Sequence, residues 1–356
     1  MKKIQFKIVL SILTISILII SCKPIIYNVA YPTLDDGKYD SEFPYKSSSK
    51  ELEEISNSVK LLNCMAFYES YIFRKESKIK KESINELTLL NKSVDIGRYN
   101  RTASGSATII YSESGVVALL TCAHIIDFPD TVYTYYFEDS GKETEFVESI
   151  SIKVRQNNYI PDFPERGNIE VLISDIKQDI AIVGNIYPAS LSQEIKEFKY
   201  PIGAAKNLEW GSFVYAFGYP MNYKMISKGL VSSPNRDGNG AFLLDAVFNR
   251  GFSGGIILGI KDGVPNFELV GMVTSVAAEG EIVLRPLAPL SDMVINPLVP
   301  YNGPVSLERK LNIKYGVTKA VSIEAIREFI LDNEDYLSSE GYFLSSIFET
   351  DDEKED

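Results

Sequence analysis

Short apolar or alternating stretches follow one another through most of the chain, and this pattern limits the fold more than any other feature. Each stretch ends in a polar turn, and helical periodicity is scarce. The stretches are 107–111, 116–120, 150–154, 169–173, 180–183, 213–217, 229–232, 241–244, 255–260, 269–276 and 313–317. Alternation over such short lengths is typical of β-strands. The sequence therefore predicts an all-β protein, a sandwich or a double barrel.

The strands fall into two halves with a connection between them. Residues 187–210 contain Pro188, Pro201 and Gly203 without a clear period, and we interpret them as this connection. One helix is expected after the last strand, because Ser322 can cap it. Its apolar stripe consists of Ile323, Ile326, Phe329 and Ile330.

The N-terminus has the pattern of an export signal. Three lysines among the first seven residues precede an apolar run over 8–20 that is too short to span a bilayer comfortably. Residues 19–22, Ile-Ile-Ser-Cys, resemble the bacterial lipobox, which implies cleavage before Cys22 and acylation of its sulfur. An ordinary signal peptide, or an uncleaved anchor that happens to end in cysteine, is the alternative.

Charge and residue counts exclude two classes of function. The net charge of −12 argues against a nucleic-acid partner, because phosphate binding needs clustered Lys and Arg. One histidine and three scattered cysteines leave no set of ligands for a zinc site of the usual kind. After acylation of Cys22, Cys64 and Cys122 remain; they could form a disulfide in an oxidising compartment, and the sequence leaves that question open.

Three segments carry side chains that together suit hydrolysis. The only histidine, His124, follows an apolar strand, Asp179 directly precedes another, and Ser253 lies between glycines at the start of a third. Taken alone, each has an ordinary structural interpretation: a core histidine, a turn aspartate and a tight turn. Cleavage of an amide at neutral pH needs a nucleophile, a base, a group that orients the base, and donors for the oxyanion. The three segments supply all of these.

The expected roles follow from this chemistry. Ser253 would attack, His124 would accept and return its proton, and Asp179 would orient the imidazole. The backbone N–H groups of Gly251 and Ser253 would form the oxyanion hole, since glycine permits the turn that aims its N–H inward. We expect neither a cofactor nor a metal ion.

The order His, Asp, Ser and the surrounding motifs resemble the chymotrypsin clan of serine proteases. Residues 245–255, Asp-Ala-Val-Phe-Asn-Arg-Gly-Phe-Ser-Gly-Gly, are similar to the HtrA (Deg) branch. Further matches lie at 105–107, 216–220, 228–232 and 269–274. The resemblance covers about residues 59–331. It implies two perpendicular six-stranded antiparallel β-barrels, with the catalytic triad between them and a C-terminal helix.

The resemblance also implies a division of the chain. We expect a trypsin-like serine protease domain over 58–335, with an N-barrel at about 58–190 and a C-barrel at about 207–335. Too few residues follow the closing helix for a PDZ domain. The remaining segments are a lipoprotein signal peptide at 1–21, the lipidated cysteine with a spacer at 22–57, and an acidic tail at 336–356.

Some positions of this chain depart from the family pattern, and others are expected to set the substrate specificity. Phe252 stands where HtrA proteins have Asn and where trypsin-like enzymes have the Asp that pairs with a new N-terminus, so trypsin-style activation is not expected. Val247 stands where trypsin-like enzymes carry an acid, which implies an apolar rather than basic residue before the scissile bond. Thr274, Ser275 and Val276 would bind the substrate backbone by β-addition, although barrel core is an equal alternative for Val276.

The sequence therefore predicts a lipid-anchored serine endopeptidase of the bacterial cell envelope, acting on a protein or peptide. Two alternatives stay open. A catalytically impaired protease fold could serve as a binding or adhesion lipoprotein, a function that the bulk of Phe252 would favour. An enzyme of the same fold could act on esters, because the same triad serves any acyl transfer.

Overall fold

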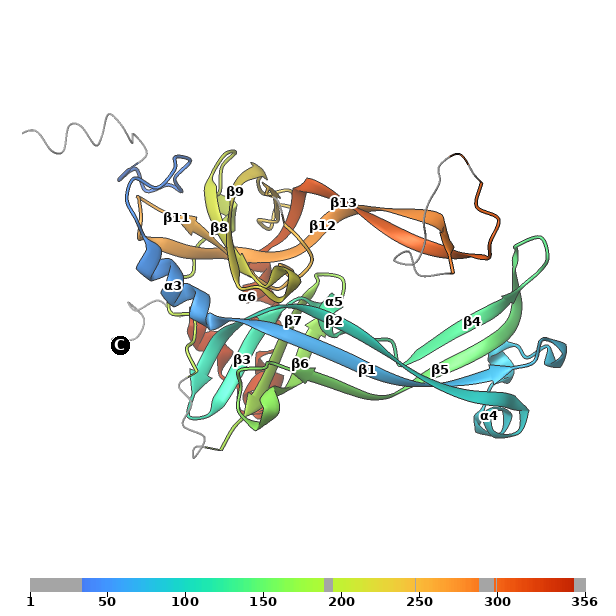
Figure 1. The fold of residues 1–356 in the computed structure, drawn as a ribbon. Helices are drawn as coiled ribbons and strands as arrows, with labels where there is room; N and C mark the ends of the chain where they lie inside the picture. The colour runs from blue at the N-terminus through green and yellow to red at the C-terminus, as the bar shows by residue number, and fades with distance from the viewer. Residues whose placement is uncertain (1–33, 189–194, 247, 288–297, 299, 349–356) are drawn as a thin grey trace, which may run out of the picture.

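The computed structural model describes residues 34–188, 195–246, 248–287, 298 and 300–348, which form two β-barrels lying side by side (Figure 1). Six strands in the antiparallel order β1-β2-β3-β7-β6-β5 make the first barrel, and pairing of β5 with β1 closes it. Strand β4 pairs with β5 outside this ring. The strands are β1 Val59–Phe73, β2 Ser93–Glu113, β3 Val116–Thr121, β4 Thr131–Phe137, β5 Glu143–Tyr159, β6 Asn168–Asp175 and β7 Ile180–Ile186.

The second barrel is closed in the order β10-β13-β12-β11-β8-β9, again antiparallel. Its strands are β8 Phe213–Gly218, β9 Met225–Ser233, β10 Phe242–Asp245, β11 Ile256–Ile260, β12 Phe267–Pro286 and β13 Val305–Ser322. The predicted all-β fold of two six-stranded barrels is therefore confirmed. The strands form where the apolar pattern predicts, because burial follows it: all six residues of β8 and all five of β11 are buried.

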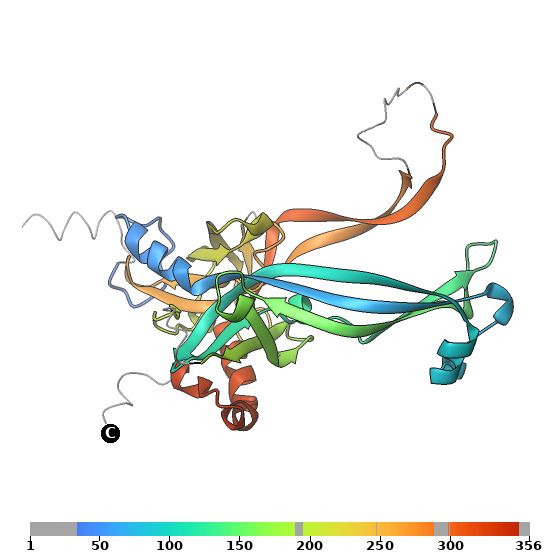
Figure 2. The same cartoon turned by 60° about the horizontal axis from the view of Figure 1, so that its bottom comes forward.

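Both barrels extend into arms that project to the same side of the molecule (Figures 1 and 2). The first arm consists of the outer parts of β1, β2 and β5 together with β4, and a small core of Phe73, Ile79, Val147 and Ile150 stabilises it. The second arm is a two-stranded ribbon of β12 and β13. Strands this long were not expected, since the outer half of β2 is exposed on both faces and shows no alternation.

Short helices lie around the barrels. The α-helices are α3 Ser49–Ser58, α4 Glu86–Lys92, α5 Ala123–Ile126, α6 Ile323–Asp332 and α7 Glu334–Ser339. The 3₁₀-helices are η1 Lys75–Ser77, η2 Lys81–Ser83, η3 Glu165–Gly167, η4 Ala205–Asn207, η5 Pro220–Asn222 and η7 Leu344–Phe348. Helix α6 is the expected closing helix: the Ser322 hydroxyl accepts a hydrogen bond from the Ala325 N–H at 3.2 Å. Among the described residues, no helix has the length and apolarity needed to cross a membrane.

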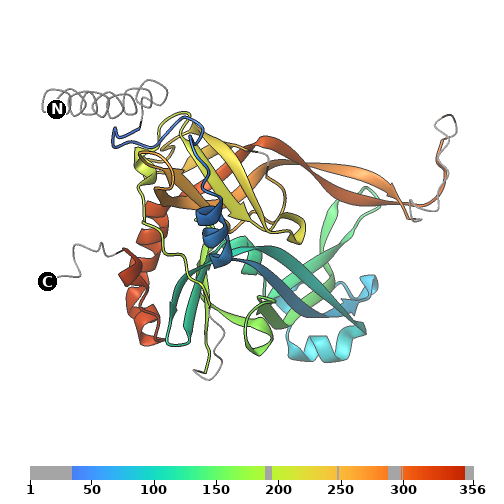
Figure 3. The same ribbon diagram turned by 60° about the vertical axis from the view of Figure 1, so that its left-hand side comes forward.

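Segments at both ends of the described chain pack against the barrels (Figure 3). Tyr39 pairs with Lys261 beside β11, and its hydroxyl donates to Glu268 at 2.7 Å, so this part of the expected spacer packs on the second barrel. The described part of the expected tail also folds. Leu337, Tyr342 and Leu344 are buried, and Tyr342 lies against Gly184 of β7.

Candidate active site

His124 lies in the one-turn helix α5, which directly follows β3. Strand β3 pairs with β7, with Thr121 opposite Ala181, and this register brings the residue before β7, Asp179, beside His124. The Asp179 carboxylate oxygens lie 2.8 and 2.9 Å from His124 Nδ1, and one of them accepts the His124 backbone N–H at 3.0 Å. The imidazole side chain is 44% exposed and the carboxylate side chain 21%. The ring is therefore held by Asp179 on one edge and accessible to solvent elsewhere.

The loop that carries Ser253 is held against this part of the first barrel. The Ser106 N–H donates to the Ser253 carbonyl at 2.8 Å. A β-carbon built at Gly105 would lie 3.0 Å both from Ser253 O and from Cγ1 of Ile125, the residue after His124. Ser253 is half-buried. The structure thus pairs His124 with Asp179 in the first barrel and places the Ser253 loop of the second barrel beside the segment that carries His124.

Ser106 is a contributor to the site that sequence reasoning did not identify. Its fully buried hydroxyl donates to the Gly251 carbonyl at 2.7 Å and accepts the Tyr219 N–H at 2.9 Å. It therefore fixes the loop before Ser253 from across the barrel interface. The two partners are 145 positions apart in the chain, so the only signal was that Ser106 falls within one of the family's motifs.

Gly251 and Ser253 are the residues whose N–H groups are predicted to form the oxyanion hole. The Gly251 and Ser253 N–H groups donate no hydrogen bond to any described residue, while the Gly251 carbonyl is turned away onto Ser106. Gly251 has φ +107°, and a β-carbon there would lie 2.8 Å from Pro220 Cα. The loop therefore requires glycine at this position.

The side chain of Phe252 lies inside the second barrel rather than in the cleft. It is 2% exposed, packs on Phe248 with ring centroids 4.5 Å apart, and lies close to Gly218. Its bulk thus fills the barrel core beneath the Ser253 loop.

Cys122 lies beneath the triad and is also a residue that sequence reasoning did not place there. Its thiol donates to the Val273 carbonyl at 3.3 Å, and the same carbonyl accepts the Gly254 N–H at 2.8 Å. Burial, and secondarily the Asp179 charge, hold the pKa of this thiol well above its usual range. Cys64 and Cys122 are both free and buried.

Cys122, His124 and Asp179 also offer three atoms of the kinds that bind metals, all within 4.8 Å of one another. A metal ion bound to all three through His124 Nδ1 would have to displace the bond between that nitrogen and Asp179. The arrangement therefore suits a hydrogen-bonded triad better than a metal centre.

The strand predicted to bind substrate runs past the Ser253 loop. The Val273 N–H donates to the Gly255 carbonyl at 2.8 Å, which places Thr274 and Ser275 next along β12. Thr274 is buried, and its hydroxyl donates to the Lys319 carbonyl at 3.3 Å. The backbone of Val276 pairs with Thr318. Val247 and Cys22 lie outside the described residues.

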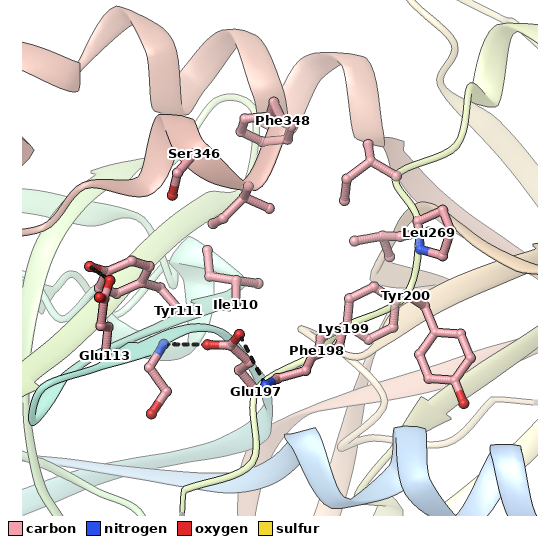
Figure 4. A pocket seen from close by; sticks show the side chains of 14 residues that line it. Ile110, Tyr111, Glu113, Glu197, Phe198, Lys199, Tyr200, Leu269, Ser346 and Phe348 are labelled. Carbon is pink, nitrogen blue, oxygen red and sulfur yellow. Dashed lines mark hydrogen bonds and ion pairs between the residues drawn. The ribbon is translucent and has the colours of Figure 1, made fainter. Parts of the chain in front are cut away.

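A pocket of about 550 Å³ lies elsewhere, between β2, the connection and η7 (Figure 4). Glu197 enters it from the connection and accepts the Ser112 N–H at 2.8 Å. None of the triad residues lines this pocket.

Comparison with known proteins agrees with this geometry. Residues 105–272 match the family model described as the trypsin-like peptidase domain. No curated protein matches the chain.

Among solved structures, the chain is similar to the HtrA-type protease AlgW with a tripeptide (14% identity, TM-score 0.41), covering 83% of this chain and 65% of that one. It is also similar to Deg5 (16%, TM-score 0.34; 65% and 87% covered) and to the inactive form of the Rv3671c protease (12%, TM-score 0.36; 65% and 83% covered). The chain spans less than two thirds of the length of the AlgW structure.

Proposed function

We propose that this protein hydrolyses peptide bonds with His124, Asp179 and Ser253 as its catalytic triad, a proposal that the match of residues 105–272 to the trypsin-like peptidase domain supports. One observation carries the proposal. The chain's single histidine is held by a carboxylate at 2.8 Å, beside the loop that presents Ser253. A satisfied core histidine would be buried, whereas this ring is 44% exposed.

The reaction uses these groups in sequence. Ser253 Oγ attacks the carbonyl carbon of the scissile bond while His124 Nε2 takes its proton, and Asp179 holds the Nδ1–H and stabilises the imidazolium. The oxyanion accepts hydrogen bonds from the Gly251 and Ser253 N–H groups. Return of the proton to the leaving amine yields an acyl-enzyme, which water hydrolyses by the same steps in reverse order.

We propose an apolar rather than basic residue before the scissile bond. The support is the residue type at Val247, together with substrate binding along Thr274, Ser275 and Val276 of β12. A library of peptides that varies this position tests it. Cleavage after Lys or Arg in preference to apolar residues would contradict the proposal, and a preference for esters would favour the esterase alternative.

We also propose that the protein is anchored to a membrane of the bacterial envelope through acylated Cys22. The support is the lipobox-like sequence at 19–22 and the apolar run before it. Growth with labelled palmitate should label the parent but not Cys22→Ser. The variant should leave the membrane fraction, and labelling of both proteins would contradict the assignment.

Fluorophosphonate labelling of a protein lacking residues 1–22, read by intact mass, tests the triad. We expect one adduct on the parent, none on Ser253→Ala, and slowed labelling of His124→Ala and Asp179→Asn. Circular dichroism controls for folding. A folded parent that takes no adduct would contradict the proposal and favour the binding-protein alternative.

A further inference from the structure

Strand β12 leaves the catalytic cleft with one edge unpaired. Its pairing with β11 ends at Met272, opposite Ile256. From Thr274 to Pro286, β13 is its only strand partner among the described residues. The free edge therefore begins beside Ser253 and continues along the second arm. Unpaired strand edges present N–H and C=O groups that readily accept a further strand.

One face of this arm carries exposed apolar residues, together with Arg309 at the position opposite Ile282. Ile282 and Leu284 alternate along β12, with exposed fractions of 77% and 68%. Leu307, which is 74% exposed, lies opposite Leu284 on β13. The other face carries an ion pair between Arg285 and Glu308 at 2.8 Å. The ribbon is thus amphipathic, and its apolar face lies in solvent, which is unusual unless that face binds a partner.

The direction of β12 determines which part of a substrate would lie along the arm. The strand runs outward from the cleft, so an antiparallel substrate strand runs inward, and its residues upstream of the scissile bond lie over the arm. Ile282 lies six residues beyond Val276, a distance of about 20 Å along a strand. If the third upstream residue of the substrate faces Val276, about the ninth faces Ile282.

We propose that the second arm extends the substrate site and takes an extended polypeptide with alternating apolar residues as an added strand. This inference rests on the proposed function. Backbone hydrogen bonds along the free edge would hold the segment. Ile282 and Leu284 would select apolar side chains at alternate upstream positions, because cross-strand neighbours on one face of a sheet contact each other.

Three peptides with the same scissile sequence test the proposal. One has about four residues upstream, one has about twelve with alternating apolar residues, and one has about twelve with those residues replaced by Asn and Thr. We expect kcat/KM for the long apolar peptide to exceed the other two by about tenfold. N-methylation of its upstream amides should remove the advantage, since it blocks strand addition.

Variants of the arm provide the second measurement. Ile282→Asn with Leu284→Asn should lower kcat/KM for the long apolar peptide about tenfold and leave the short peptide unchanged. Glu281→Asn on the opposite face is the matched control and should leave both unchanged. All three sites are exposed, so the variants should fold.

The outcomes are distinguishable. Equal cleavage of the short and long peptides, or no effect of the double variant, overturns the arm proposal but leaves the proposed peptidase activity intact. A parent that dimerises in sedimentation, and is made monomeric by the double variant without any effect of peptide length, overturns it in favour of a second copy as the occupant. If neither short peptide nor fluorophosphonate reacts, the proposed function itself fails.

Discussion

The thiol of Cys122 and the carboxylate of Asp179 lie within 4.8 Å of each other beneath the imidazole of His124. Because burial and the Asp179 charge raise the pKa of the thiol, it is protonated at neutral pH and can serve as a donor beside the carboxylate. Its hydrogen bond goes to the Val273 carbonyl, which also accepts the Gly254 N–H of the Ser253 loop. Cys122 thus lies where it can position both Asp179 and the loop that carries Ser253.

Replacement of this thiol should impair turnover. Cys122→Ala removes the hydrogen bond to the Val273 carbonyl, which also accepts the Gly254 N–H, and should therefore lower kcat/KM. Cys122→Ser keeps a donor and should retain the parental value. Steady-state kinetics of both variants check this, and equal kcat/KM in the Ala and Ser variants would rule out a positioning role.

Asp179→Asn should lower kcat by roughly a thousandfold or more, because an amide neither fixes the Nδ1–H tautomer nor stabilises the imidazolium. The fold should persist, since the change is nearly isosteric. Steady-state kinetics measure the effect. Asp127→Asn, an exposed acid one turn after His124, is the matched control and should leave kcat unchanged. A loss of less than tenfold in Asp179→Asn would argue against the assigned role.

Ser106→Ala should impair both stability and turnover. The variant loses the bond to Gly251 and leaves the Tyr219 N–H with only its longer bond, to the Gly251 carbonyl at 3.3 Å, at a cost of about 1–3 kcal/mol. A loosened oxyanion loop should lower kcat more than it changes KM. Urea unfolding and kinetics measure the two effects. Exposed Ser104→Ala is the control; equal kcat in the parent and Ser106→Ala would contradict this role.

Asp40 should make the protein less stable as the pH rises from about 4 to 6. Burial raises the pKa of its carboxyl to about 6, although the Gly263 N–H partly offsets this. The native state therefore holds a proton that the unfolded state loses near pH 4, so the free energy of unfolding falls across this window, by at most about 3 kcal/mol.

Comparison with Asp40→Asn isolates this contribution. The variant should be more stable than the parent at pH 7 and no more stable at pH 4, because only the parent ionises. Urea unfolding across the pH range measures the difference. A variant that is less stable at pH 7 would show that the ionised carboxylate stabilises the fold.

The sequence predicts those parts of the structure that local pattern determines. Short apolar or alternating stretches marked the strands of both barrels, and motif context selected His124, Asp179 and Ser253 as candidates. The contacts of Ser106 and Cys122 could not be predicted, because they join segments more than 140 positions apart. The arms escaped prediction for a different reason: Ile282 and Leu284 look like core residues in sequence, yet the fold leaves them exposed.

The docking of Tyr39 on the second barrel has a consequence for how the chain folds. Its bond to Glu268 joins residues 229 positions apart, and the segment that bears Tyr39 precedes the first barrel. The segment that bears Tyr39 can therefore dock only after β12 has been synthesised. Contacts of such long range slow folding. Ser253 lies on the same second barrel, which closes only when β13 pairs with β10, so His124 and Ser253 should meet only late in folding.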